Sequence, residues 1–115
     1  MEKMVRRSDF RRVFDSGRQV VGAPAVVYTA PNGLECSRLG VVVSSRAGGA
    51  VARNRIRRRL REWARRSWER VRPGWDVILV GRRTAREMPF RELAEELERL
   101  FQAAELWRSK RDGEA

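Results

Sequence analysis

The sequence Val51-Ala52-Arg53-Asn54-Arg55-Ile56-Arg57-Arg58-Arg59-Leu60-Arg61 combines the periodicity of a helix with six arginines and one asparagine. Apolar side chains recur here and just beyond at spacings of three and four residues, which places them on one face of a helix. This apolar stripe consists of Ala52, Ile56, Leu60, Trp63 and Ala64. The segment therefore predicts a helix that packs against a core with one face and binds a polyanion with the other.

On a helical wheel at 100° per residue, a row of arginines borders the apolar stripe, and a second group lies further round. The first row is Arg53, Arg57, Arg61 and Arg65, with Asn54 and Arg58 beside it, and the second group is Arg55, Arg59 and Arg66. Only Glu62 interrupts them on the wheel, and one acid is too few for a face of internal salt bridges. We therefore interpret this face as a binding surface rather than as a solvated helix face.

The composition of the 115-residue chain supports a polyanionic partner. Lys plus Arg number 26 against 15 for Asp plus Glu, which gives a net charge of +11 and a pI near 11.5. Arginines number 24 and lysines 2. Because guanidinium groups fork onto phosphates and stack on bases, this ratio favours an RNA surface, although a GC-rich genome also produces it.

Several classes of function are disfavoured. The chain has no histidine. It therefore cannot form a Ser-His or Cys-His catalytic pair or a histidine-ligated metal site, and it lacks the commonest general base. Cys36 is the one cysteine, which excludes an internal disulfide and a cysteine cluster. Neither a membrane span nor the apolar core of a signal peptide is recognisable, and we expect a cytoplasmic protein with no membrane partner. Glutamates between Glu92 and Glu98 are expected on the outer face of a helix.

The first part of the chain predicts a short helix followed by strands. Ser8 is a suitable N-cap for a helix that carries Phe10, Val13 and Phe14, and Gly17 can end it. Extended segments are expected at about Ala25 to Ala30 and Arg38 to Ser45. The turn-prone residues 31–33 separate them, and this arrangement predicts a hairpin or meander.

The second part predicts a strand between two helices. The arginine helix should run to about Trp68 or Val71, Trp75 to Gly81 should form a buried strand, and Pro89 should open an amphipathic final helix. We expect the order αβββαβα in an α+β two-layer sandwich with one parallel strand pair. Residues 1–115 should form a single domain with a charged, frayed tail after about residue 108.

Two groups of residues allow both a structural and a functional interpretation. Phe10 and Phe14 share one helix face, and with Tyr28 they could belong to the core or form a platform on which single-stranded bases stack. Asn54 could be an ordinary surface residue, donate to a phosphate, or offer its carbonyl oxygen to a hydrated divalent ion. The residues alone leave both alternatives open.

The chain resembles the bacterial ribonuclease P protein subunit from about Met4 to the final helix. The resemblance rests on Ser8-Asp9-Phe10, Val13-Phe14, Gly17, Tyr28-Thr29, Arg38-Leu39-Gly40-Val41-Val42-Val43-Ser44, Gly48, Ala50-Val51 and, above all, Arg53-Asn54-Arg55-Ile56-Arg57-Arg58. It implies a protein that binds a catalytic RNA and precursor tRNA, with no obligate protein partner. The holoenzyme is an endoribonuclease that removes the 5′ leader, and the RNA and its Mg²⁺ carry the chemistry, so no catalytic residue is expected in the protein. It also implies a left-handed βαβ crossover, against the usual right-handed rule.

Site residues follow from the resemblance, position by position. The arginine helix would face the catalytic RNA through Arg53, Asn54, Arg55, Arg57, Arg58, Arg61 and Arg65, with Asn54 also a candidate metal ligand. A cleft lined by the first helix and a sheet face would hold the leader through Phe10, Phe14, Tyr28 and Arg46. Arg46 aligns with one basic residue of the family's Ser-Lys-Lys segment, whereas Ser45 replaces its neighbour and removes one charge.

Three functions compete on this evidence: the RNA-processing subunit, an architectural or ribosomal RNA binder, and a basic module for DNA or anionic lipid. All three predict a steep salt dependence, because each involves several contacts to phosphates. A stacking cleft beside a separate arginine helix favours the first. Phenylalanines wholly within the core would favour the second, and exposed apolar residues beside the arginines would favour lipid binding.

Overall fold

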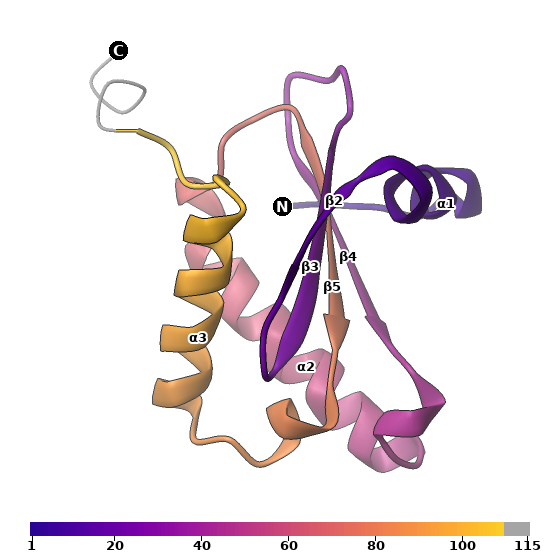
Figure 1. The fold of residues 1–115 in the computed structure, drawn as a ribbon, viewed down its shortest axis with the longest axis vertical. Helices are drawn as coiled ribbons and strands as arrows, with labels where there is room; N and C mark the ends of the chain where they lie inside the picture. Colours follow the sequence, from indigo (N-terminus) through magenta and orange to yellow (C-terminus); the bar gives the residue numbers. More distant parts are fainter. Residues whose placement is uncertain (110–115) are drawn as a thin grey trace.

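A five-stranded mixed sheet lies at the centre of the computed structural model, which describes residues 1–109 (Figure 1). The strands are β1 (Glu2–Lys3), β2 (Arg18–Val21), β3 (Ala25–Pro31), β4 (Arg38–Val43) and β5 (Trp75–Gly81), in the order β1-β4-β5-β3-β2. β5 is central, parallel to β4 and antiparallel to β3. Its residues 76–79 are all buried, as a strand covered on both faces requires.

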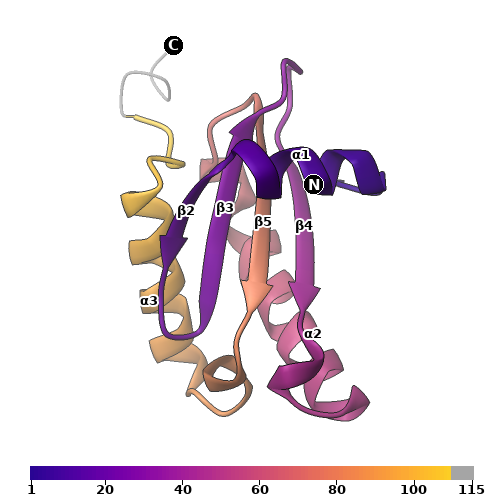
Figure 2. The same ribbon diagram turned by 45° about the vertical axis from the view of Figure 1, so that its right-hand side comes forward.

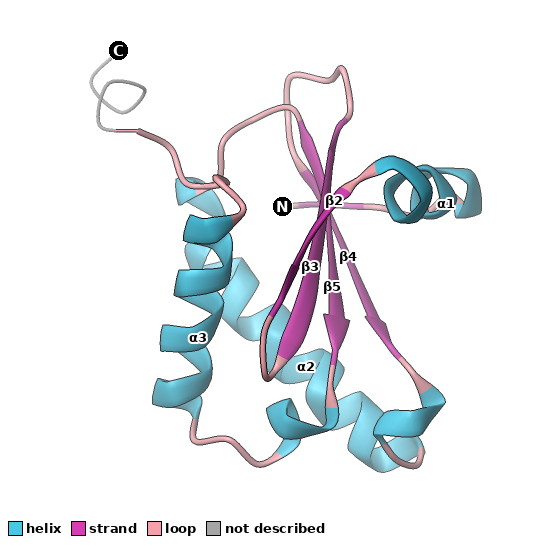
Figure 3. Cartoon of the chain, viewed as in Figure 1, coloured by secondary structure: helices cyan, strands magenta, loops and turns pink. Residues whose placement is uncertain are grey.

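Three helices cover the sheet from two sides (Figures 2 and 3). α1 (Arg7–Ser16) crosses one end of the first face, whereas α2 (Ala50–Ser67) and α3 (Phe90–Ala103) cover the opposite face. Short 3₁₀ turns η1 (Ser45–Ala47), η2 (Trp68–Arg70) and η3 (Arg83–Arg86) connect these elements. The class is therefore α+β, as predicted.

The larger core lies between the sheet and the helices α2 and α3. All five residues of the predicted apolar stripe of α2 are buried, which confirms the sequence prediction. Ile56 and Leu60 are fully buried, and each contributes about 1.5–3 kcal/mol of hydrophobic free energy. Trp63 meets Phe101 of α3 edge to face, with ring centroids 4.9 Å apart. Side-chain burial thus fixes which face of α2 remains outside.

The chain after α3 returns to the end of α2. Trp107 forms an isolated bridge with Val71, and its ring stacks in the same aromatic group as Trp63 and Phe101. The backbone N–H of Arg108 donates to the Arg70 carbonyl at 2.7 Å. The predicted tail begins beyond this point, and its residues 110–115 lie outside the described residues.

The predicted hairpin or meander of the segments Ala25 to Ala30 and Arg38 to Ser45, now β3 and β4, was wrong. β3 and β4 are not neighbours, because β5 lies between them. The turn-prone loop after Pro31 correctly predicted that β3 and β4 run in opposite directions. It could not predict that β5, which begins 32 residues after the end of β4, would lie between them. A strand buried on both faces takes the central position, and β5 has that pattern.

Three further predictions need correction. The sheet has two parallel pairs instead of one, because β1 also pairs with β4. Helices lie on both faces of the sheet, so the arrangement is not a simple two-layer sandwich. Ser8 is the second residue of α1 and does not cap it; Arg6 holds the cap position without a side-chain hydrogen bond.

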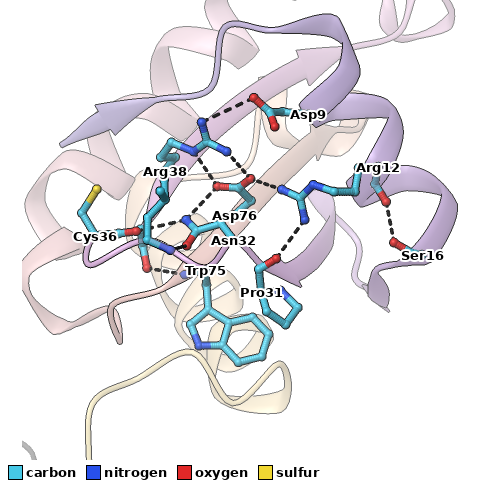
Figure 4. A network of polar contacts seen from close by, with 11 residues as sticks. Asp9, Arg12, Ser16, Pro31, Asn32, Cys36, Arg38, Trp75 and Asp76 are labelled. Atoms are coloured by element: carbon cyan, nitrogen blue, oxygen red, sulfur yellow. Dashed lines mark hydrogen bonds and ion pairs between the residues drawn. The ribbon is translucent and has the colours of Figure 1, made fainter.

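A buried carboxylate joins α1 to the sheet (Figure 4). Asp76 at the start of β5 is fully buried. Its carboxylate accepts hydrogen bonds from Nε of Arg38 on β4 at 2.8 Å and from Nη2 of the same residue at 2.7 Å. Arg12 of α1 donates to the same carboxylate and to the carbonyl oxygen of Pro31, the latter at 2.8 Å. Asn32 adds a hydrogen bond of 3.0 Å. One anion thus ties together α1, β4, β5 and the loop after β3.

The protonation of Asp76 reflects these contacts. Burial, the largest influence, raises the pKa of Asp76, but the hydrogen bonds from Arg38 and Asn32 and the charges of Arg38 and Arg12 together outweigh it, and the pKa lies below its ordinary value. The hydrogen bond with Asp76 likewise raises the pKa of Arg38. Both groups are therefore charged at neutral pH.

We expect Asp76→Asn to lower the free energy of unfolding by about 2–3 kcal/mol. This is less than the about 3–5 kcal/mol of a fully buried pair, because Arg12 and Arg38 are partly exposed and can be hydrated. Urea denaturation at pH 7 measures it, with Asp15→Asn, at an exposed position on α1, as control. Equal stability of the two variants would contradict the assignment.

The same pair predicts an acid dependence with a definite sign. Because the folded-state pKa of Asp76 is depressed, its stabilisation is complete above the unfolded value of about 3.9 and is lost as the pH falls through the folded value. The wild type should therefore lose stability more steeply than Asp76→Asn below about pH 5. Parallel curves for the two proteins would show that Asp76 does not contribute.

Candidate nucleic-acid interface

The outward face of α2 and the N-terminal strand β1 enclose a cationic groove of about 520 Å³. Five of the predicted RNA-binding residues line it together with Met1, Lys3 and Glu62: Asn54, Arg57, Arg58, Arg61 and Arg65. Three of the four arginines of the predicted row, Arg57, Arg61 and Arg65, therefore share one surface with Asn54 and Arg58. Lys3 reaches it because β1 pairs in parallel with the start of β4, next to the helix, a contribution that the sequence analysis missed.

Hydrogen bonds within the groove hold four of its side chains, in the pairs Asn54–Arg57 and Glu62–Arg65. The Oδ1 of Asn54 accepts a hydrogen bond from Nη1 of Arg57 at 2.8 Å. Glu62 accepts hydrogen bonds from Arg65 and Arg66 at 3.0 Å, and chiefly the bond from Arg65 lowers the pKa of Glu62. Arg58 and Arg61 are exposed and form no ion pair within residues 1–109. The groove therefore presents a net positive surface to solvent.

The other two predicted residues of α2 lie outside this groove. Arg53 is half-buried, and its Nε atom is buried without a hydrogen-bond partner. Arg55 is exposed but donates through Nε to the carbonyl oxygen of Arg86 at 3.1 Å. The structure thus separates these two from the row that faces the groove.

Arg59 supports the fold rather than a surface. Its guanidinium donates to the carbonyl oxygens of Ala85, Arg86 and Met88 in and after η3. Burial, and then the charge of Arg55, lowers its pKa. These contacts satisfy the carbonyl groups of a loop that has no sheet partner. A helical wheel places Arg59 near Arg55, but it cannot predict which of the arginines donates hydrogen bonds to backbone carbonyl groups.

The sheet face under α1 is only partly covered. α1 lies across one end, where its Phe10 ring packs directly on Gly40; a Cβ at Gly40 would come within 2.6 Å of the ring. Beyond α1 the same face continues along β3 and β5 through alternate residues. Val26, Val42 and Val80 there are half-buried, and Val21 at the edge is 58% exposed. Below α1 this face is not covered by another helix in Figure 2. An open sheet surface with partly exposed valines, which we call the sheet cleft, therefore runs from α1 toward the opposite end of the strands.

The predicted aromatic residues lie at the α1 end of this cleft. Phe14 is 38% exposed and meets the half-buried Tyr28 edge to face, with centroids 4.9 Å apart and planes at 77°. Phe10 is half-buried and belongs to the small core under α1. The structure therefore places Phe14 and Tyr28 together at the α1 end of the cleft, whereas Phe10 packs on Gly40.

Arg46 lies at the far end of the same face. It lines a pocket with Val26 and Val80 of the sheet and with Arg82 and Arg83, which follow β5. Arg82 and Arg83 were not predicted as site residues. The sequence indicates only that these arginines follow the predicted buried strand. It does not indicate on which face of the sheet their side chains lie.

The described residues contain neither a cluster of metal ligands nor a membrane-spanning helix. Within residues 1–109, histidine, cysteine and carboxylate side chains form no group of three or more that could hold a metal ion. No helix in that part of the chain is both long and apolar enough to cross a bilayer.

Comparison with other proteins identifies the family. A family model described as Ribonuclease P matches residues 1–105. The ribonuclease P protein component of Caldanaerobacter subterraneus subsp. tengcongensis is 36% identical over 110 residues, which cover 96% of this chain and 95% of the relative. That of Symbiobacterium thermophilum is 40% identical and covers 87% of this chain and 88% of the relative.

Solved structures of ribonuclease P proteins have the same fold as this chain. The RNase P protein of Staphylococcus aureus superposes with a TM-score of 0.83 at 29% identity, covering 94% of this chain and 99% of that one. That of Thermotoga maritima gives 0.80 at 30% identity, covering 90% and 97%. The chain therefore belongs to the ribonuclease P protein family, the protein component of the endoribonuclease that processes the 5′ ends of precursor tRNA.

Proposed function

We propose that this protein uses two separate surfaces, the α2 groove for the catalytic RNA and the sheet cleft for the single-stranded 5′ leader. The observation that carries the proposal is the separation itself. The α2 groove holds the row of arginines, whereas Phe14 and Tyr28 lie on the opposite face of the sheet. A folded RNA and a single strand can therefore be bound at the same time.

The arginine groove suits structured RNA. Arg58 and Arg61 have no carboxylate partner within residues 1–109, so their guanidinium groups are available for bidentate contacts to phosphates. Asn54 adds a neutral amide that can donate to a phosphate or to a base edge. Phosphate contacts position a protein on RNA without reading its sequence, which suits docking of a protein subunit.

The cleft suits an unpaired strand. The exposed part of Phe14 and the ring of Tyr28 offer apolar surface to bases, and each stacked base contributes about 1–3 kcal/mol without a sequence requirement. An architectural RNA binder would not need this surface, because its phenylalanines would lie wholly within the core. A lipid-binding module would need an apolar patch exposed beside the arginines. The apolar stripe of α2 is buried, and the large apolar side chains exposed near the arginines, Val51 and Met1, are single residues.

Mg²⁺ is proposed to belong to the RNA and the substrate. The oxygen ligands that the α2 groove offers from side chains are those of Asn54 and Glu62, and both already accept hydrogen bonds from arginines. Surrounding cations disfavour a dication further. The described residues therefore do not make a magnesium site by themselves, and Asn54 as a ligand stays a prediction that would require a contribution from RNA.

The β4–α2–β5 connection is proposed to be the left-handed crossover of the family. In Figure 2 both strands point downward, β5 lies to the left of β4, and α2 passes behind the sheet. That path turns in the left-handed sense. It positions α2 so that its arginine row faces the edge of the sheet where β1 lies.

Phe14→Ala should weaken binding of precursor tRNA to the reconstituted holoenzyme about 5- to 150-fold, the equivalent of about 1–3 kcal/mol of lost stacking. Binding of mature tRNA, which has no leader, should not change. Equilibrium binding of both RNAs to holoenzyme assembled with a bacterial ribonuclease P RNA measures the effect. Phe90→Ala is the matched control, because Phe90 is also half-buried but lies at the start of α3.

Arg57→Ala should weaken assembly with the catalytic RNA about tenfold and lower the slope of log affinity against log salt by about 1. Leader discrimination within assembled holoenzyme should persist. Arg91→Ala on α3 is the control, since it removes an equally charged helical side chain that is 91% exposed. Equal salt slopes for the two variants would contradict the assignment of the α2 groove.

A further inference from the structure

The sheet has an open edge where β1 ends beside β4. β1 accompanies β4 only along Arg38 and Leu39, and the pairing finishes with a hydrogen bond from the Met4 N–H to the Leu39 carbonyl at 2.9 Å. The chain then leaves the sheet and enters α1 at Arg7. Beyond this point β4 forms the outer edge of the sheet in Figure 2. The later residues of β4 therefore have no neighbouring strand on this side within residues 1–109.

The backbone of Val41 points out of this open edge. The N–H and C=O groups of one strand residue point to the same side, and that side recurs at every second residue. Because the Leu39 carbonyl faces β1, both backbone groups of Val41 face the same edge, about 6.6 Å further along β4. No hydrogen bond reaches them on this edge within residues 1–109. Val41 thus offers one donor and one acceptor side by side.

A small pocket, which we call the β4 edge pocket, lies against Val41. It encloses about 100 Å³, and its lining includes Met4, Phe10, Lys3 and Arg61. Met4 and Phe10 belong to the small core under α1, whereas Lys3 and Arg61 also line the α2 groove. Both cations are exposed, and neither forms a salt bridge within residues 1–109. The pocket therefore connects apolar walls to the cationic α2 groove.

This combination of groups fits a nucleotide. Aromatic and thioether side chains favour contact with a flat ring. A backbone donor beside a backbone acceptor matches the hydrogen-bonding edge of an unpaired base. The volume compares with about 150 Å³ for a cavity that holds benzene, so the pocket admits one ring and not a strand of several residues. An extended peptide, the usual partner of an open strand edge, would also meet Lys3 and Arg61 without bringing a negative charge.

We propose that the β4 edge pocket binds one unpaired base of the RNA that occupies the α2 groove. The edge of the base lies on the N–H and C=O groups of Val41, and its phosphate lies on Lys3 and Arg61. This inference rests on the proposed function of the α2 groove. Contacts to phosphates position a protein without reading bases, whereas a base held in a pocket fixes the register of the protein along the RNA.

Val41→Pro removes the proposed donor with little other change. Proline has no N–H and is tolerated on an open strand edge, and the preceding Gly40 has no Cβ to clash with the proline ring. Val21→Pro is the matched control on the opposite edge of the sheet. The Gly22 N–H donates to the Ala25 carbonyl, so by alternation the Val21 N–H points away from β3. Urea denaturation checks that both variants are folded.

The test is chemical probing of base edges in a bacterial ribonuclease P RNA, alone and assembled with each protein. Dimethyl sulfate and a carbodiimide report the Watson–Crick edges of all unpaired bases. One base that reacts in the free RNA should be protected by the wild type and by Val21→Pro, and should react again with Val41→Pro. Assembly with Val41→Pro should be about five- to thirtyfold weaker, as expected for loss of a base contact.

Lys3→Ala provides a second variant, at an exposed residue whose truncation leaves the core intact. It should lower the slope of log assembly affinity against log salt by about 0.7, the value for one contact to a single strand. It should also reduce protection at the same base and at no other. This readout decides the proposal even if Val41→Pro does not fold.

The outcomes separate the β4 edge pocket from the α2 groove. If the wild type protects no unpaired base, or if protection persists in folded Val41→Pro and in Lys3→Ala, the pocket is overturned and its edge is left to another occupant, such as an extended peptide. The α2 groove still stands in that case, provided that Arg57→Ala weakens assembly. If Arg57→Ala also leaves assembly unchanged, the proposed function of the groove fails together with the pocket.

Discussion

The carboxylate of Asp76 determines where α1 crosses the sheet, and with it the extent of the cleft. Asp76 is buried at the start of β5, and its ligands come from α1, β4 and the loop after β3. A buried ion pair adds little net stability compared with apolar packing, because desolvation offsets its Coulomb energy. Its directional hydrogen bonds, in contrast, allow one placement of α1. The close packing of the Phe10 ring on Gly40 adds to this placement.

The two proposed binding surfaces depend on the central position of β5. Both faces of β5 are covered at its start, with α1 on one side and the α2–α3 core on the other. At its end, Gly81 lies under Ile56, where a Cβ would come within 2.6 Å of that side chain, so α2 approaches the strand closely. The residues directly after Gly81 reach the opposite face at the pocket that Arg46 lines. One strand thus supports both the α2 groove and the cleft.

The sequence predicted the helices and strands better than it predicted which strands pair in the sheet. The helical period of Ala52, Ile56 and Leu60 is local information, and the predicted burial of that stripe was confirmed. The contact of β5 with β3 is not local, and the hairpin prediction failed there. The strands β1 and β2 have only two and four residues, too few for a reliable alternation, and no bounds were predicted for them. Gathering of Arg46, Arg82 and Arg83 follows from the sheet order and could not be anticipated without it.

The arginine content has two causes in this fold, and only one of them concerns RNA. Arg59 donates to three backbone carbonyls, and Arg38 binds Asp76 with two nitrogens. Arg70 pairs with Glu98, which raises the pKa of Arg70, while its guanidinium stacks 4.2 Å from the Trp107 ring. Lysine cannot replace such forked or stacked contacts. The excess of arginine over lysine therefore reflects the architecture as well as the ligand, and the evidence for RNA binding lies in the arginines that remain unpaired along the α2 groove and the cleft.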